Sequence, residues 1–194
     1  NLFCFSFLDS SNLETQDFLK KQNNAFQLTD INLQQDSFVW PKVQMINYRA
    51  FGQKLQGLLY KPSASSIGEK LPMIIYFYER YSDRFHDYKT PAPSASTINV
   101  SWFVSNGYAV FIPDIIYKVG RPGESALKCI NKGVDQVLKI EKRIDPKRMG
   151  LQGQSWGGYQ TAFLITRTNR YACAMAGAPV SNMFSAYGGI RYSS

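Results

Sequence analysis

The chain has 194 residues, 44% of them apolar, and carries 22 Lys and Arg against 14 Asp and Glu, a formal net charge of +8. This length predicts one domain with some residues to spare. The apolar content excludes a mainly disordered or collagen-like chain, and no apolar run approaches the ~20 residues of a membrane helix. The net charge makes nucleic acid the first partner to consider. Residues 146–194 contain no Asp, Glu or His.

The first forty residues differ in composition from the rest. Residues 1–40 are polar and rich in Asn and Gln, and they end at Trp40-Pro41, where the proline favours extended backbone. Their apolar start, residues 2–8, has no basic segment before it and no small-residue cleavage site, so it does not resemble a signal peptide. We expect it to be a strand in a chain that began earlier, which leaves both an exported or periplasmic and a cytoplasmic location open.

From residue 43 onward, the pattern predicts strands and helices in alternation. Residues 43–51 and 54–60 are typical of two hairpin strands joined at Gly52-Gln53. Continuous apolar runs then predict buried strands, while helical spacing or a capping glycine such as Gly107 predicts helices. The expected strands are residues 73–78, 108–112, 148–152 and 171–178, and the expected helices are residues 97–106, 124–143 and 157–168. This alternation predicts an α/β fold with a mainly parallel sheet.

The most informative motif is G-x-S-x-G, formed by Gly153, Ser155 and Gly157, with an expected buried strand before it and a helix after it. A serine at the tip of such a sharp turn has a strained backbone, and glycines two residues to either side remove side chains that would collide. The helix N-terminus then faces the developing oxyanion, with the backbone N–H of Trp156 as its first donor. The motif predicts a nucleophile elbow rather than a structural glycine turn.

Several segments resemble the prolyl oligopeptidase family of serine peptidases, most closely its dipeptidyl-peptidase and acylaminoacyl-peptidase branches. The specific match is Gly-Gln-Ser-Trp-Gly-Gly-Tyr at residues 153–159, and weaker matches are residues 57–62, 111–114, 144–148 and 176–181. The resemblance implies an α/β-hydrolase catalytic domain paired with a β-propeller that restricts access to short peptides. Residues 1–40 would then be the end of the propeller and the crossing segment, and residues 41–194 the N-terminal part of the catalytic domain.

The resemblance also implies roles for individual residues. Ser155 resembles the acyl-forming nucleophile and Trp156 the backbone oxyanion donor. Tyr78 fits the tyrosine whose hydroxyl is the second oxyanion donor, although Glu79-Arg80-Tyr81-Ser82 replaces the small residues and proline common in relatives. A tyrosine packed at the sheet edge is the alternative role for Tyr78. We expect the substrate-pocket wall from Val180, Met183 and Tyr187, each of which also fits an ordinary core position.

The residues that a serine nucleophile needs are missing after Ser155. Serine hydrolysis requires a base and a carboxylate, and in this fold both follow the serine along the chain. His86 lies before Ser155 in a loop of solvated composition, and Asp114 is typical of a turn that holds a loop. A natural serine-only remnant is the alternative, but we expect a truncated catalytic domain that is inactive alone, with strand 171–178 left as an unpaired edge.

Two other functions remain open from the sequence: a carboxylic-ester hydrolase with the same elbow, and a noncatalytic interaction module. The basic residues are interleaved with acidic ones and form no aromatic-basic motif, so we expect a peptide substrate and no nucleic acid. The cysteines, Cys4, Cys129 and Cys173, form no C-x-x-C pair and are expected to be buried, unpaired thiols. We expect no metal, cofactor or membrane span, and leave homo-oligomerisation open.

Overall fold

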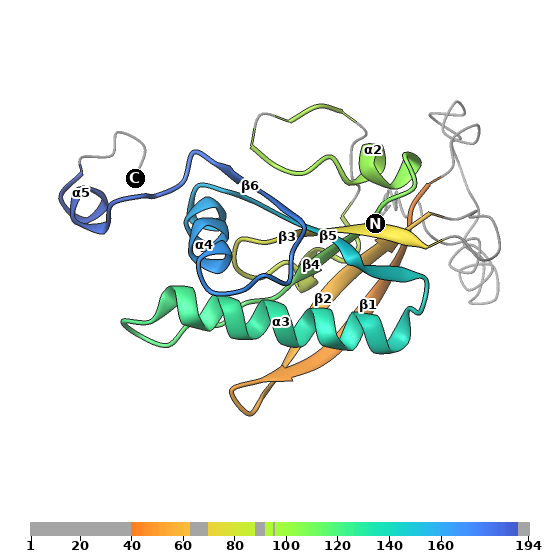
Figure 1. The fold of residues 1–194 in the computed structure, drawn as a ribbon, viewed down its shortest axis with the longest axis horizontal. Helices are drawn as coiled ribbons and strands as arrows, with labels where there is room; N and C mark the ends of the chain where they lie inside the picture. Colours follow the sequence, from red (N-terminus) through yellow and green to blue (C-terminus); the bar gives the residue numbers. More distant parts are fainter. Residues whose placement is uncertain (1–39, 63–69, 88–91, 95, 190–194) are drawn as a thin grey trace, which may run out of the picture.

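The computed structural model describes residues 40–62, 70–87, 92–94 and 96–189, and in this part six strands form one sheet (Figure 1). The sheet order is β1-β2-β4-β3-β5-β6. The strands are β1 (Lys42–Ala50), β2 (Gln53–Lys61), β3 (Leu71–Tyr76), β4 (Ala109–Pro113), β5 (Ile144–Gln154) and β6 (Cys173–Gly177). β3, β4, β5 and β6 run parallel, whereas β1 and β2 are antiparallel additions at one edge. The expected mainly parallel sheet is confirmed.

Helices cover both faces of the sheet. α3 (Pro122–Ile140) and α4 (Trp156–Ile165) lie on one face, where the larger apolar core includes Ile130, Val134 and Leu164 (Figure 1). α2 (Val100–Ser105) packs on the other face with a smaller core. Side chains alternate between the two cores along β3 and β4, as strands covered on both faces require. The remaining elements are the 3₁₀ turn η2 (Ser82–Arg84) and the short helix α5 (Met183–Gly188).

The boundaries differ from the sequence prediction by a few residues. The hairpin turn is Phe51-Gly52, one residue earlier than expected, and both residues have positive φ, as two-residue turns between twisted strands favour. α3 begins at Pro122 instead of residue 124, because proline suits the first helical position. α2 begins only at Val100, since the Asn99 side chain caps it by accepting from the Trp102 N–H at 3.0 Å.

Gly107 ends α2 as the sequence predicts. Its φ is +81°, and its N–H donates to Val104 O at 3.1 Å while the Tyr108 N–H donates to Phe103 O at 3.0 Å. This pair of hydrogen bonds is the Schellman arrangement, which needs a left-handed residue at this position. The chain then turns directly into β4.

β6 lies at the edge of the described sheet, and four of its five residues are exposed. For this reason the expectation for Cys173 was wrong: its thiol is exposed on β6, whereas Cys129 is buried under α3 as expected. Cys4 and residues 1–39 lie outside the described residues, so the division into a propeller end and a catalytic domain stays a prediction. No helix among the described residues combines the length and hydropathy needed to cross a membrane.

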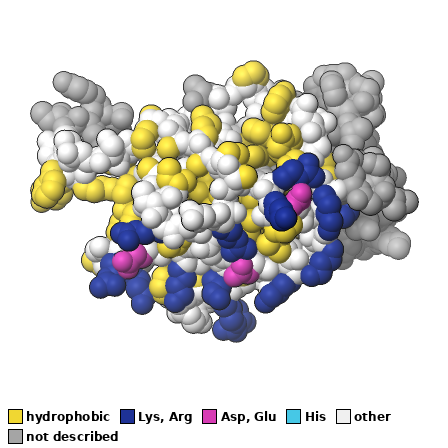
Figure 2. Space-filling model, in the orientation of Figure 1, with side chains coloured by type: hydrophobic (Ala, Val, Ile, Leu, Met, Phe, Trp, Pro, Cys, Tyr) yellow, Lys and Arg dark blue, Asp and Glu magenta, His cyan; other side chains and the backbone are white. Residues whose placement is uncertain are grey.

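The basic side chains are spread over the surface and are partly paired. Figure 2 shows Lys and Arg along the side of the molecule where α3 runs, with a few acidic side chains among them. Three of the pairs are Arg170–Asp135 at 2.8 Å, Arg148–Asp145 at 2.9 Å and Arg121–Glu124 at 3.3 Å. The absence of nucleic-acid binding remains a prediction.

Glu141, at the C-terminal end of α3, forms hydrogen bonds to β2 and to the residue before β5. Its carboxylate accepts from Arg143 Nε at 3.0 Å, from the Arg143 N–H at 3.2 Å and from Lys61 Nζ at 2.9 Å. Only 11% of the Glu141 side chain is exposed. The Arg143 guanidinium, followed by Lys61, lowers the pKa of Glu141 to about 2, from an ordinary value of 4.5. The end of α3 is thereby fixed to β2 and to the start of β5.

We expect Glu141→Gln to lower the stability of the protein by about 2 kcal/mol at neutral pH. Because the folded pKa is depressed, this contribution is complete above pH 4.5 and disappears as the pH falls toward 2. Thermal unfolding from pH 7 down to pH 3 measures the difference, which should shrink on acidification. The control is Glu124→Gln, in a pair with Arg121 that is mostly solvent-exposed and should change little. A difference that is constant with pH would contradict the prediction.

Candidate active site

The candidate active site lies where three parallel strands end. Tyr78 follows β3, Asp114 follows β4 and Ser155 follows β5. β3 pairs in parallel with both β4 and β5, so these carboxyl ends meet at one edge of the sheet. Ligands of open α/β sheets bind at this edge. The fold therefore brings Ser155 and Tyr78, which are 77 positions apart in the sequence, to the same side of the molecule.

Ser155 has the strained backbone of a nucleophile elbow. Its φ is 57° and its ψ is −111°, values that an L-residue adopts only when the surroundings enforce them. The glycines of the motif make the turn possible through close approaches. A β-carbon on Gly153 would collide with the carbonyl oxygen of Gly157. A β-carbon on Gly157 would collide with the carbonyl oxygen of Phe77. A β-carbon on Gly158 would lie 2.6 Å from Gly177 O. The structure thus contains the strand–turn–helix geometry that the motif predicts.

The side chain of Ser155 is not used to cap α4. Serine at a helix start usually accepts from a backbone N–H of the first turn, yet here its side chain makes no cap hydrogen bond. Its backbone is held instead: the Ser155 N–H donates to Gly177 O at 2.9 Å, and its carbonyl accepts from the Tyr159 N–H at 3.0 Å. Trp156 is the first residue of α4, where N–H groups have no acceptor within the helix. The roles of Ser155 as nucleophile and of the Trp156 N–H as oxyanion donor stay predictions.

Tyr78 lies beside the first turn of α4. Its side chain is 37% exposed, and the missing β-carbon of Gly157 leaves room for the Phe77 and Tyr78 backbone. The carbonyl oxygen of Tyr78 accepts from Gln160 Nε2 at 2.8 Å and from the Tyr117 hydroxyl at 2.7 Å. The peptide after Tyr78 is therefore fixed to α4 and to the loop after β4.

Tyr117 and Gln160 are the residues near the elbow that the sequence analysis missed. The Tyr117 hydroxyl accepts from Trp156 Nε1 at 3.0 Å and from Gln160 Nε2 at 2.6 Å. Gln160 follows Trp156 by four positions, so the helical period after the motif places both side chains on one face of α4. No sequence pattern indicates Tyr117, because it lies in an irregular loop after β4.

Asp114 holds the segment that follows Tyr78, in agreement with its expected role. Its carboxylate accepts from the N–H of Tyr81 at 2.8 Å, from the N–H of Ser82 at 3.0 Å and from the Ser82 hydroxyl at 2.6 Å. The neighbouring Ile115 N–H donates to Glu79 O at 2.8 Å. The backbone of residues 79–82, which differ from those common in relatives, is thus held by hydrogen bonds to the end of β4.

Of the three residues expected to form the substrate-pocket wall, Val180 lies next to the elbow. Its N–H approaches Ser155 O at 3.4 Å. Met183 and Tyr187 lie on α5, which stands apart from α4 and the sheet in Figure 1. Tyr187 is 97% exposed and Met183 is 40% exposed, so within the described residues neither forms an enclosed wall. Their role in substrate binding stays a prediction.

His86 is exposed, just after η2, and its ring packs edge-on against Phe85 at 4.9 Å between centroids. Its position agrees with the expectation that it belongs to a solvated loop. No group of three or more His, Cys, Asp and Glu suited to a metal ion occurs in the described part of the chain.

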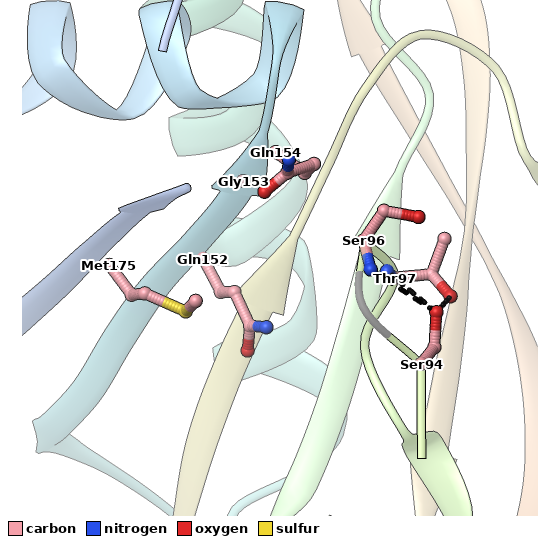
Figure 3. Close-up of a pocket in the computed structure, with 7 residues that line it drawn as sticks. All are labelled: Ser94, Ser96, Thr97, Gln152, Gly153, Gln154 and Met175. Carbon is pink, nitrogen blue, oxygen red and sulfur yellow. Dashed lines mark hydrogen bonds between the residues drawn. The ribbon is translucent and has the colours of Figure 1, made fainter. Parts of the chain in front are cut away.

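A pocket on the opposite face of β5 does not include the nucleophile (Figure 3). It has an empty volume of about 270 Å³, partly open to solvent, and is lined by Ser94, Ser96, Thr97, Gln152, Gly153, Gln154 and Met175. Gln152 and Met175 point into the space between β5 and the segment before α2 (Figure 3). Gly153 faces α4, since a β-carbon there would meet Gly157 and Thr161. Because side chains alternate along a strand, Gln152 and Gln154 face away from α4.

The sequence of residues 119–192, which includes the elbow, matches the family model described as the prolyl oligopeptidase family. The resemblance inferred from the motif at Ser155 is thereby confirmed.

Two relatives of the chain are named as peptidases. An uncharacterized peptidase, YuxL of Bacillus subtilis (strain 168), is 37% identical over 59 residues, which is 30% of this chain and 9% of that protein. Dipeptidyl peptidase 8 of Homo sapiens is 29% identical over 147 residues, which is 67% of this chain and 16% of the human protein. The chain thus spans less than a fifth of either relative.

Solved structures of acylaminoacyl peptidases share the fold. The acylaminoacyl peptidase in complex with Z-Gly-Gly-Phe-chloromethyl ketone has a TM-score of 0.65 and 20% identity, covering 84% of this chain and 27% of that chain. The Pyrococcus horikoshii acylaminoacyl peptidase also has a TM-score of 0.65, with 19% identity, covering 86% of this chain and 28% of that chain. The fold of the described residues is accordingly the α/β-hydrolase fold.

Proposed function

We propose that these 194 residues form the nucleophile-bearing part of a serine peptidase that acts on short peptides, with the base and its carboxylate supplied by sequence following Ser194. The observation that carries the proposal is the backbone of Ser155, which is held at φ 57° between a parallel strand and a helix N-terminus. Its side chain is not consumed by helix capping. The match of residues 119–192 to the family model also supports the proposal. So does the coverage, because the chain covers only 16% of human dipeptidyl peptidase 8 and 27% of the acylaminoacyl peptidase chain.

In this mechanism, Ser155 Oγ attacks the carbonyl carbon of the scissile peptide bond while its proton passes to the base. The carbonyl oxygen becomes an oxyanion, which the Trp156 N–H and the Tyr78 hydroxyl stabilise. The C–N bond then breaks as the base gives its proton to the leaving amine, and an acyl-Ser155 intermediate remains. Water, deprotonated by the same base, attacks this ester and releases the acid.

The test uses the whole protein and the 194-residue chain in parallel. We expect the whole protein to hydrolyse chromogenic X-Pro or Ala-Ala amides, and a fluorophosphonate probe to label it at Ser155. The 194-residue chain should be labelled far more slowly, because no His, Asp or Glu follows Ser155 in its sequence. Rapid labelling of the chain alone would contradict an external base, and hydrolysis of acyl esters without peptide amides would favour a carboxylic-ester hydrolase.

A further inference from the structure

We propose that Tyr117 and Gln160 are positioning residues that hold Tyr78 and Trp156, the two oxyanion donors, in place. This inference rests on the proposed function and adds to it a pair of residues that do not touch the substrate. Its basis is a set of four hydrogen bonds that joins the loop after β3, the loop after β4 and the first turns of α4.

The Tyr117 hydroxyl is fully used by this set of bonds. A phenol has one proton to donate and two lone pairs to accept with. Its proton goes to Tyr78 O at 2.7 Å, and its lone pairs accept from Trp156 Nε1 at 3.0 Å and Gln160 Nε2 at 2.6 Å. Burial raises the pKa of the Tyr117 hydroxyl, which therefore stays protonated around neutral pH. One hydroxyl thus connects both residues that carry an oxyanion donor.

Gln160 makes the same connection from the helix. Tyr78 O is a carbonyl and only accepts, so the Gln160 atom facing it at 2.8 Å must be Nε2. With this orientation Gln160 Oε1 is buried and has no hydrogen-bond partner among the described residues. An unpaired buried carbonyl is unfavourable, and an apolar side chain would avoid it. The amide is therefore best explained by what its Nε2 does for the Tyr78 peptide.

Two donors on one carbonyl fix the plane of the peptide after Tyr78. The Tyr78 Cα belongs to this peptide, so the atom from which the tyrosine side chain extends is held in place beside α4. The Trp156 indole is restrained in turn by Tyr117 and by stacking on Tyr159, whose ring centroid lies 4.9 Å away at an interplanar angle of 23°. Preorganised donors avoid reorganisation as the oxyanion develops, so these restraints should act on the chemical step.

The test is a double-mutant cycle in the whole protein with Tyr117→Phe and Tyr78→Phe. Tyr117→Phe removes the hydroxyl and keeps the ring. We expect it to lower kcat by about 10- to 100-fold with KM changed less than about threefold, since displaced catalytic groups affect turnover more than binding. If Tyr117 acts through Tyr78, the double variant should be scarcely slower than Tyr78→Phe alone. Affinity for a peptide boronate, a transition-state analogue, should fall in step with kcat.

The control is Tyr171→Phe. Tyr171 is also partly buried and donates its hydroxyl proton to Asn131 Oδ1 at 2.7 Å, away from the elbow. The Tyr171→Phe variant should lower the melting temperature about as much as Tyr117→Phe does, while its kcat stays unchanged. Gln160→Met, which keeps the volume and removes the donor, provides a second cycle with Tyr78→Phe in case Tyr117→Phe does not fold. The double variant Gln160→Met with Tyr78→Phe should likewise be scarcely slower than Tyr78→Phe alone.

The outcomes separate this inference from the proposed function. Fully additive losses in both cycles, or an unchanged kcat in Tyr117→Phe and Gln160→Met, would overturn the positioning role. An unchanged kcat in Tyr78→Phe would also overturn the positioning role. In that case, fluorophosphonate labelling at Ser155 would still support the serine mechanism. Retention of hydrolysis by Ser155→Ala would instead remove the proposed function itself.

Discussion

Ser155→Ala in the whole protein is expected to lower kcat for peptide amides by about 10⁴-fold or more, with little change in KM. The variant removes the oxygen that forms the acyl bond and leaves the backbone donors in place. Initial rates at saturating substrate, together with loss of fluorophosphonate labelling, measure the effect. We expect no change in melting temperature, because the Ser155 side chain makes no helix-cap hydrogen bond.

The size of this effect follows from where Ser155 lies. Its φ of 57° directs the residue out of the turn between β5 and α4, at the helix end where partial positive charge accumulates. A serine that merely capped the helix would contribute about 1 kcal/mol of stability and no catalysis. Loss of activity without loss of stability therefore distinguishes the two roles.

The control is Ser105→Ala. Ser105 ends α2 on the opposite face of the sheet, and its hydroxyl donates to Ser101 O within the same helix at 2.7 Å. Its replacement should leave kcat and labelling unchanged. If Ser155→Ala kept its activity, the nucleophile would have to be another residue, and the elbow would be a structural turn.

Gly157→Ala is expected to destabilise the protein by about 3 kcal/mol and to abolish labelling of Ser155. The added β-carbon would collide with the carbonyl oxygen of Phe77, and a backbone atom in a buried strand end has little freedom to move. Relief of the collision would push apart the first turn of α4 and the peptide that leads into Tyr78. Thermal unfolding and probe labelling of the whole protein measure the two effects.

Gly188→Ala is the matched control. A β-carbon at Gly188, the last residue of α5, would meet nothing within 4 Å. Both substitutions add one methyl group to a helical glycine, so the difference between them isolates the contact with Phe77. Equal melting temperatures for the two variants would show that the strand end and the helix are less tightly packed than the structure indicates.

The sequence alone predicted the parts of this protein that depend on local patterns. The buried strands, the Gly107 helix cap and the elbow at Ser155 each follow from apolar periodicity or from a backbone conformation that glycine permits. The boundaries shifted by a few residues because they depend on caps such as Asn99 and on the twist of the hairpin. The exposure of Cys173 was missed because the expectation of a buried thiol followed from its apolar neighbours, although strand 171–178 was itself expected at an edge of the sheet.

The tertiary structure decided which distant residues meet at the end of β5. Tyr117, Gln160 and Tyr78 are separated by dozens of residues, and no periodicity relates them. They converge because β3, β4 and β5 are parallel neighbours, whose ends and following loops share one edge of the sheet. The basic charge and the lack of carboxylates after Asp145 are properties of the sequence itself. The orientation of the Tyr78 peptide, in contrast, results from hydrogen bonds that exist only once the sheet has formed.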